Sequence, residues 1–347
     1  MKKTIILLLS LVVFFCMNSF SQDHQQPYLY LTNYTIPKQG NTVGQIKIST
    51  NDIESVAIGG EHAHAFKVGK DHELSVRRDK LKGNTATFDV VLQVKTSTGE
   101  FSKTFKIVKD EFIRNKVIAH RGAWKNTGAP ENSIAALRHA VTLGCEGSEF
   151  DVHMSADSLP VVNHDPTIQG VSIAKTNASD LLTIKLANGE LLPTLENYLK
   201  SGMEQTKTKL ILEIKPSELG KANSIALTRK VVALVEKLYA QAWVDYISFD
   251  YDACKEVMKL APYAKVAYLR GDKTPAELAT DHFFGLDYNF SVLEKNPDWI
   301  EQAKSKKLTI NVWTVNDRTQ LEELLKKNVD FITTNEPELL LSIVKEP

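Results

Sequence analysis

The sequence predicts an α/β fold, an eight-stranded parallel (β/α)8 barrel, preceded by a small all-β sandwich domain. Up to about residue 110, the chain of 347 residues shows short stretches in which apolar and polar side chains alternate, with turn residues between them. Beyond that point apolar strand patterns alternate with helix patterns, which is typical of parallel strands covered by helices. The length also favours two domains over one. We therefore expect a β-sandwich over residues 22–112 and a barrel over residues 113–347.

The first 21 residues have the pattern of a secretory signal peptide. Lys2 and Lys3 precede an apolar run over residues 5–15, and residues 19–21 (Ser-Phe-Ser) have the small-x-small pattern of a cleavage site. The apolar run is shorter than the ~20 residues that a membrane-spanning helix needs, so we expect no stable membrane insertion. The pattern predicts export to the periplasm or to the outside of the cell.

Basic and acidic side chains are balanced, with 42 of each. Removal of Lys2 and Lys3 with the signal would leave a slight acidic excess, which argues against a nucleic-acid partner. Two cysteines would then remain, Cys145 and Cys254, each among apolar residues of a helix-like segment. We favour two separate buried thiols over a disulfide, even in an oxidising compartment.

Five short strand patterns predict the sandwich domain. They lie at residues 28–31, 45–48, 74–76, 87–94 and 103–108. This pattern resembles the cadherin-like or immunoglobulin-like modules that extracellular bacterial enzymes carry. The resemblance implies a spacer or a docking surface that contacts the cell envelope or a polysaccharide.

The second part of the chain contains eight candidate barrel strands with helices between them. The expected strands lie near residues 117–121, 148–153, 210–215, 245–249, 265–269, 283–287, 308–314 and 330–334, with a hairpin arm at 160–164. The expected helices lie at residues 132–143, 193–200, 224–240, 251–260, 275–280, 297–305, 319–327 and 336–344. Asn132 is the expected cap of the first of these helices.

Charged side chains follow several of the predicted strands at the point where each strand ends. These side chains are His120, Arg121, Glu149, Asp151, His164, Glu213 and Lys215. In a parallel barrel the carboxyl ends of the strands meet on one face, so residues distant in sequence become neighbours. Glu149 and Asp151 are two positions apart on one strand and therefore point the same way. The set contains what metal-assisted phosphodiester cleavage requires: carboxylates for a cation, histidines for proton transfer and basic groups for phosphate.

The same residues resemble a known family. The ordered fragments HRG, PEN, EFD, HD and LEIK, followed by YISFD, NVWTVN and DFITTNEP, are similar to those of the glycerophosphodiester phosphodiesterases, from about Val117 to the C-terminus. One such fragment carries little weight, but the ordered set is specific. The resemblance implies a TIM barrel, one divalent cation (Ca²⁺ or Mg²⁺) and hydrolysis of glycerophosphodiesters, as small-molecule substrates, to glycerol 3-phosphate and an alcohol.

Carried over position by position, the resemblance assigns a role to each residue of the set. It implies that the metal ligands are Glu149, Asp151 and Glu213. It implies that the acid/base pair is His120 and His164, without deciding which is the acid, and that the phosphate contacts are Arg121 and Lys215. Trp313 ends a strand and is the candidate for an apolar wall against the glycerol carbons, although it fits the core equally well.

Three other functions stay open at this point. A cyclising lyase, like the related sphingomyelinase-D enzymes, would release a cyclic phosphate. A zinc phosphoesterase would need histidine ligands, and the candidate acids are not interleaved with histidines. A noncatalytic barrel that binds envelope or polysaccharide would not require both histidines.

Several neighbours of the set are candidates for supporting roles. Glu131 is expected to brace Arg121 or the metal site. His153 lies on the same strand as Asp151 and is expected in the core or in support of the site. Asn335 stands where aspartate is common in the family, and Ser158 stands where glycine is usual. We expect Asn335 to affect packing or hydrogen bonding, and we expect the loop after His164 to differ from that of relatives.

Overall fold

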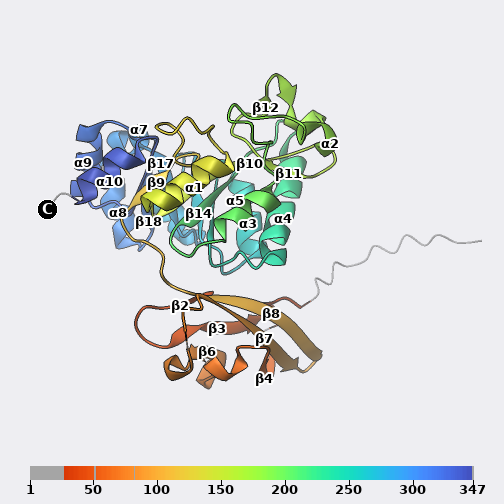
Figure 1. Cartoon of the computed structure of the whole chain (residues 1–347). Helices are drawn as coiled ribbons and strands as arrows, with labels where there is room; N and C mark the ends of the chain where they lie inside the picture. Colours follow the sequence, from red (N-terminus) through yellow and green to blue (C-terminus); the bar gives the residue numbers. More distant parts are fainter. Residues whose placement is uncertain (1–26, 51, 82, 346–347) are drawn as a thin grey trace, which may run out of the picture.

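A computed structural model describes residues 27–50, 52–81 and 83–345. It consists of an all-β region, red to orange in Figure 1, that lies below a closed barrel of strands and helices. The last strand of the all-β region ends at Lys109, and the first barrel strand begins at Val117. The expected signal peptide, residues 1–21, lies outside the described residues.

The all-β region contains two four-stranded sheets, in the orders β1-β3-β6-β5 and β2-β8-β7-β4. The strands are β1 (Leu29–Leu31), β2 (Thr35–Ile36), β3 (Thr42–Ile48), β4 (Ile53–Gly59), β5 (Phe66–Val68), β6 (Glu73–Val76), β7 (Thr87–Thr96) and β8 (Gly99–Lys109). Alternate residues of β7 are buried, as the period of a strand requires. Buried side chains from both sheets belong to one hydrophobic cluster, which holds the two sheets together.

Eight parallel strands form the barrel, and β9 closes it by pairing with both β10 and β19. They are β9 (Val117–Ala119), β10 (Gly147–Met154), β14 (Lys209–Ile214), β15 (Val244–Ser248), β16 (Val266–Tyr268), β17 (Gly285–Asn289), β18 (Thr309–Trp313) and β19 (Phe331–Thr334). The arm β11 (Pro160–Val162) pairs antiparallel with β10. All eight strands and the arm were expected, so the predicted fold class is confirmed.

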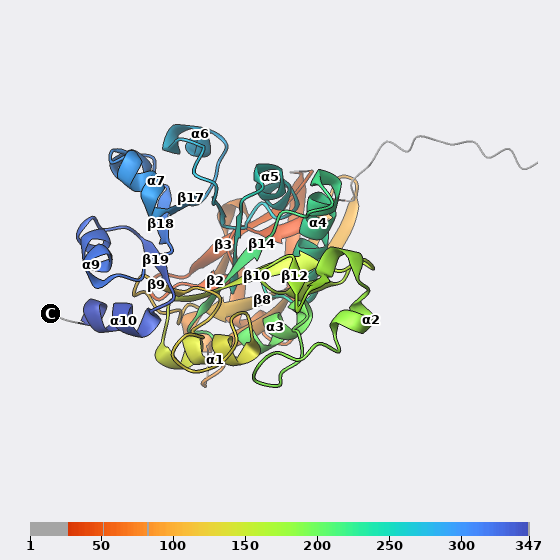
Figure 2. The ribbon, with the colours of Figure 1, turned by 90° about the horizontal axis from the view of Figure 1, so that it is seen from above.

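Helices surround the barrel, as the view in Figure 2 shows. They are α1 (Ile134–Leu143), α2 (Ala178–Leu181), α3 (Leu195–Gly202), α4 (Lys221–Lys237), α5 (Tyr251–Leu260), α6 (Pro275–Thr280), α7 (Phe290–Lys295), α8 (Trp299–Ser305), α9 (Arg318–Lys326) and α10 (Pro337–Lys345). The sequence did not predict α7. It also did not predict two elements that follow β11, α2 and the short hairpin of β12 (Thr167–Ile168) and β13 (Val171–Ser172). These elements form an excursion after β11 around a small cluster of buried apolar residues.

The expected cap of the first helix was wrong by one residue. Ser133, not Asn132, caps α1, because the Ser133 side chain accepts a hydrogen bond from the backbone N–H of Ala136. Asn132 adopts a left-handed conformation with φ of 60° and turns its side chain toward the barrel.

A partly buried acid joins the all-β region to the barrel. Glu236 of α4 accepts hydrogen bonds from the hydroxyls of Tyr28 and Tyr263 and lies 2.8 Å from Nζ of Lys103. Burial opposes ionisation of Glu236, but Lys103 and the two hydroxyls outweigh it and lower the pKa of this carboxyl. The Lys103 ion pair and the Tyr28 hydroxyl contact cross from the all-β region to α4 and favour a fixed arrangement of the two regions, whereas the Tyr263 contact lies within the barrel.

Two further expectations concern the chain as a whole. Cys145 and Cys254 are free and buried, as expected. Within the part of the chain that the structure describes, no helix has both the length and the apolar character needed to cross a membrane.

Candidate active site

A cavity opens at the carboxyl-terminal end of the barrel strands. It comprises about 480 Å³ of space between atoms, including its open mouth. Its charged and imidazole-bearing lining residues are His120, Arg121, Glu149, His164, Glu213, Lys215 and Asp287. Six further residues complete the lining, and most of them are apolar: Ile247, Phe249, Leu269, Trp313, Thr314 and Thr333. The barrel therefore brings seven of the eight predicted site residues to the lining of one cavity, and Asp151 is the one that is not part of this lining.

Three carboxylates lie together beneath this cavity. Glu149 and Asp151 are two positions apart on β10, and Asp151 is paired in register with Glu213 on the neighbouring strand β14. One oxygen from each of the three carboxylates lies within 4.8 Å of the others, and all three side chains are buried. Glu149 Oε1 is buried without a hydrogen-bond partner among the described residues. An orphaned carboxylate oxygen in a cluster of hard oxygen donors fits Ca²⁺ or Mg²⁺.

The electrostatics of this triad are unfavourable without a cation. Burial raises the pKa of Glu149 well above its usual value, and the charges of Asp151 and Glu213 raise it further. Burial and Asp151 also raise the pKa of Glu213 to about 8. Burial opposes ionisation of Asp151 too, but Lys215, His164 and a hydrogen bond from Asn132 outweigh it and lower its pKa. A divalent cation among the three carboxylates would favour the charged form of each.

The two basic residues of the predicted set are held by acids of the site. Lys215 Nζ lies 2.9 Å from Asp151 Oδ1 and 2.8 Å from Glu213 Oε1. Arg121 pairs through Nη1 with both oxygens of Glu131, at 3.0 and 2.9 Å, so Glu131 braces Arg121. Because both cations also line the cavity, they present positive charge where a phosphate would enter.

His120 follows the last residue of β9, and each of its ring nitrogens lies near another polar side chain. Its Nδ1 lies 2.8 Å from Oδ1 of Asn335, and its Nε2 lies 4.0 Å from Oε2 of Glu149. An amide oxygen only accepts hydrogen bonds, so Nδ1 carries the proton and Nε2 is the unprotonated nitrogen. Burial and the nearby Arg121 charge lower the pKa of His120 to about 4.

His164 reaches the cavity from the loop that follows β11. Its Nδ1 lies 2.7 Å from Oδ1 of Asp165, its neighbour in the chain. The backbone carbonyl of His164 accepts a hydrogen bond from Nε2 of His153, at 2.9 Å. His153 therefore supports the loop that carries His164, and its alternation with Asp151 on β10 was the sequence signal for this role.

Asn132 has a role that capping alone did not predict. Its Nδ2 donates to Oδ2 of Asp151 at 2.9 Å, and its Oδ1 accepts from the backbone N–H of Asp151 at 3.0 Å. This two-way contact fixes the Asp151 carboxylate within the triad. Asparagine and serine are comparable helix caps, so no signal in the sequence pointed to this contact.

Trp313 forms part of an aromatic wall of the cavity. Its ring centroid lies 5.5 Å from that of Phe249 in an edge-to-face arrangement, and its Nε1 donates to the backbone oxygen of Asp287 at 2.9 Å. Sequence reasoning missed Phe249 and Leu269, which lie on the same wall. Both follow apolar strands at inward positions, which is the signal that could have found them.

Comparisons with known proteins agree with this geometry. The model of the glycerophosphoryl diester phosphodiesterase family matches residues 120–339. A glycerophosphodiester phosphodiesterase from Caldanaerobacter subterraneus is 29% identical over 252 residues, which are 67% of this chain and 99% of the relative.

Solved structures give the same result. The crystal structure of a glycerophosphodiester phosphodiesterase from Parabacteroides distasonis is 44% identical, with a TM-score of 0.65, and the match covers 68% of this chain and 98% of that chain. A phosphodiesterase from Oleispira antarctica shares the fold at 24% identity, with a TM-score of 0.56 over 67% of this chain and 97% of that one. The residues that the family model matches, 120–339, contain every residue of the site described above. The chain belongs to the glycerophosphoryl diester phosphodiesterase family and is an enzyme of the phosphodiester hydrolase class.

Proposed function

We propose that this enzyme hydrolyses glycerophosphodiesters to glycerol 3-phosphate and an alcohol, with one divalent cation held by Glu149, Asp151 and Glu213. The observation that carries the proposal is the buried carboxylate triad, with oxygens within 4.8 Å, next to two imidazoles in one cavity. When bound, Ca²⁺ or Mg²⁺ would supply Lewis-acid stabilisation of a phosphate oxygen. The relative from Oleispira antarctica has been solved in complex with the product sn-glycerol-3-phosphate, which supports this choice of product.

The hydrogen bonds of the two histidines support a division of the proton transfers. His120 is the base in this proposal, because Asn335 holds its proton on Nδ1 and leaves Nε2 free to accept another. A pKa lowered to about 4 keeps that imidazole neutral near pH 7. His164 is the acid in this proposal, because the Asp165 carboxylate holds the ring at Nδ1 and leaves Nε2 to donate a proton to the leaving alkoxide.

The remaining residues of the cavity bind the substrate. Arg121 offers a planar fork of donors and Lys215 a point charge, and both would neutralise phosphate charge as it grows in the transition state. Their present acidic partners, Glu131 and the triad, hold them in place before substrate arrives. The edge-to-face pair of Phe249 and Trp313 would pack against the glycerol carbons.

An assay with purified mature protein tests the proposal. Glycerophosphocholine is offered with chelator, with Ca²⁺ and with Mg²⁺, and phosphorus NMR identifies the product. We expect glycerol 3-phosphate, no turnover with chelator, and loss of activity in His120→Ala and His164→Ala. A cyclic phosphate product would favour the lyase instead, and activity that survives in either histidine variant would contradict the assigned roles.

We also propose that the chain is exported, because residues 1–21 have the charge, apolar run and small residues of a signal peptide. Cell fractionation combined with N-terminal sequencing of the mature protein tests this. Recovery in the cytoplasm with residues 1–21 intact would contradict it. Contact of the all-β region with envelope or polysaccharide stays a prediction.

A further inference from the structure

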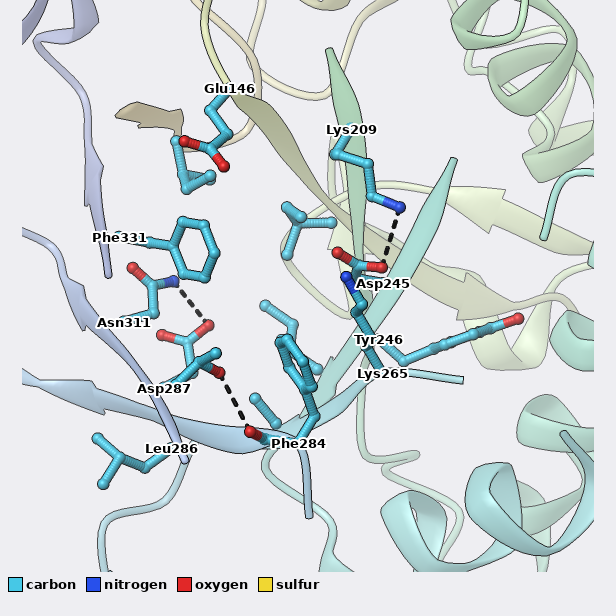
Figure 3. Close-up of a pocket in the computed structure, with 15 residues that line it drawn as sticks. Glu146, Lys209, Asp245, Tyr246, Lys265, Phe284, Leu286, Asp287, Asn311 and Phe331 are labelled. Carbon is cyan, nitrogen blue, oxygen red and sulfur yellow. Dashed lines mark hydrogen bonds and ion pairs between the residues drawn. The ribbon is translucent and has the colours of Figure 1, made fainter. Parts of the chain in front are cut away.

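A second cavity lies on the barrel axis at the opposite, amino-terminal end of the strands (Figure 3). It comprises about 500 Å³ of space between atoms, including its mouth. Most of its walls are apolar, formed by Ile118, Ile211, Ile247, Ala267, Phe284, Leu286 and Phe331. The axis of a TIM barrel is normally filled by layers of bulky side chains. In this barrel the inward position on β16 is Ala267, whose small side chain leaves part of the layer open.

The inner part of this cavity contains a carboxylate that lacks a full set of partners. Asp287 is 2% exposed, and its Oδ2 accepts a hydrogen bond from Nδ2 of Asn311 at 2.9 Å. Its Oδ1 is buried without a hydrogen-bond partner among the residues that the structure describes. Burial without a compensating cation raises the pKa of Asp287 to about 7, although the Asn311 contact opposes the shift.

The charged side chains at the mouth of the cavity do not neutralise the negative charge of Asp287. Lys209 pairs with Asp245 at 3.1 Å, so these two charges offset each other. Glu146 accepts hydrogen bonds from the backbone N–H groups of Asn115 and Lys116. The exposed Lys265 lies with its Nζ 5.0 Å from the centroid of the Phe284 ring. With three carboxylates and two ammonium groups, the lining carries one net negative charge when Asp287 is ionised.

The mouth is accessible from the junction of the two regions. A neighbouring cavity shares Glu146, Lys209, Asp245, Lys265 and Phe331 with the axial one. Its other side is formed by residues 32–35 of the all-β region. A small molecule would therefore enter the axial cavity between the all-β region and the barrel, away from the catalytic end.

We propose that the axial cavity binds a small organic ammonium ion, with the Asp287 carboxylate as its counter-ion. The ammonium would supply the donor that Asp287 Oδ1 lacks, and a short alkyl chain would fill the space beside Ala267. The Phe284 and Phe331 rings suit this class of ligand, because aromatic faces attract cations, and the Phe284 ring already lies near the Lys265 ammonium. Asp287 and Ile247 also line the catalytic cavity, so they lie between the two sites.

Calorimetric titration of the full mature chain with n-butylammonium tests the proposal, at about pH 8 and with saturating Ca²⁺. Neutral n-butanol, of the same length, and anionic butyrate are titrated for comparison. We expect one butylammonium per chain and weaker or no binding of the other two. In Asp287→Asn the affinity should fall about tenfold or more, since a hydrogen bond to a charged group is lost. In Ala267→Leu, which fills the cavity, binding should disappear.

Two control variants locate the bound ion. Asp317→Asn removes a carboxylate from the N-terminus of α9, where asparagine can replace it as cap, and should bind like the unmodified protein. Glu149→Gln changes the catalytic triad and should also leave butylammonium binding intact. Binding that is lost in Glu149→Gln, or that is unchanged in Asp287→Asn, would overturn the proposal. So would equal affinity for butylammonium and n-butanol, or no binding of butylammonium at all.

Discussion

Nδ1 of His120 lies 2.8 Å from the side-chain oxygen of Asn335. This contact connects the end of β9 to the residue after β19, across the closure of the barrel, and selects the tautomer of the proposed base. In Asn335→Ala the ring loses this constraint, and we expect kcat/KM to fall roughly 10- to 100-fold, as for other residues that orient a reactive group. Steady-state assays on glycerophosphocholine measure the loss.

Asn335→Asp tests whether residue 335 orients the His120 ring or only fills space beside it. An aspartate keeps the acceptor but adds a negative charge, which should raise the pKa of His120 from about 4. A base must be unprotonated, so the acid limb of the pH–rate profile should move to higher pH while much of the activity at alkaline pH returns. A profile with the same acid limb as the unmodified enzyme would show that His120 is not the base.

The carboxylate triad should make the cation-free protein less stable than a variant with one charge fewer. Glu149→Gln removes the charge that burial, Asp151 and Glu213 disfavour, yet the side chain can still accept the hydrogen bond from the backbone of Arg121. We expect the Tm with chelator to rise by roughly 2–4 °C, equivalent to about 1 kcal/mol. Stabilisation by added Ca²⁺ and enzyme activity should both be lost.

Thermal unfolding with and without Ca²⁺ checks this expectation. Glu301→Gln is the matched control, since it makes the same chemical change at a side chain that is 76% exposed. The control should keep both its Ca²⁺ response and its activity. If Ca²⁺ raised the Tm of Glu149→Gln as much as that of the control, Glu149 would not be a ligand.

The contacts of Glu236 should dominate the junction between the all-β region and the barrel. In Glu236→Ala the hydroxyls of Tyr28 and Tyr263 and the ammonium of Lys103 all lose their shared acceptor. Loss of a charged acceptor at this partly exposed site should cost about 2–3 kcal/mol, so denaturant unfolding should begin earlier and protease should cut between the regions. Tyr263→Phe removes only one donor and should cost about 1 kcal/mol. Equal stability of the two variants would contradict this account.

The barrel could be predicted from the sequence because the apolar residues of each strand and the charged residues at its carboxyl end are neighbours in the chain. Glu149 and Asp151 follow the period of a strand, and that period alone places both carboxylates on one face. Register between strands then sets Asp151 beside Glu213, which periodicity does not specify. The resemblance of the ordered motifs to the family, and not strand periodicity, predicted that Asp151 and Glu213 lie together.

Other parts of the site depend on contacts that no local pattern contains. The two-way contact of Asn132 with Asp151 spans 19 residues, and its left-handed backbone follows from tertiary structure rather than from helix capping. The excursion with α2, β12 and β13 was missed because its elements are short and pack on their own small cluster. In the sequence Asp287 looks like any other strand residue, because its burial results from the closure of the whole barrel around it.

Asp287 should make the stability of the protein depend on pH in a characteristic direction. Its pKa is raised by burial from 3.8 to about 7, so between these values the folded state binds a proton that the unfolded state has lost. Its contribution to the free energy of unfolding therefore falls as pH rises from about 4 to about 7, by roughly 4 kcal/mol in total, and is constant above. Asp287→Asn lacks this titration, so its stability relative to the unmodified protein should increase over that range.

Denaturant unfolding of both proteins at several pH values, with Asp317→Asn as control, measures the difference. A stability difference that does not change between pH 4 and 7 would show that Asp287 is not an isolated buried acid.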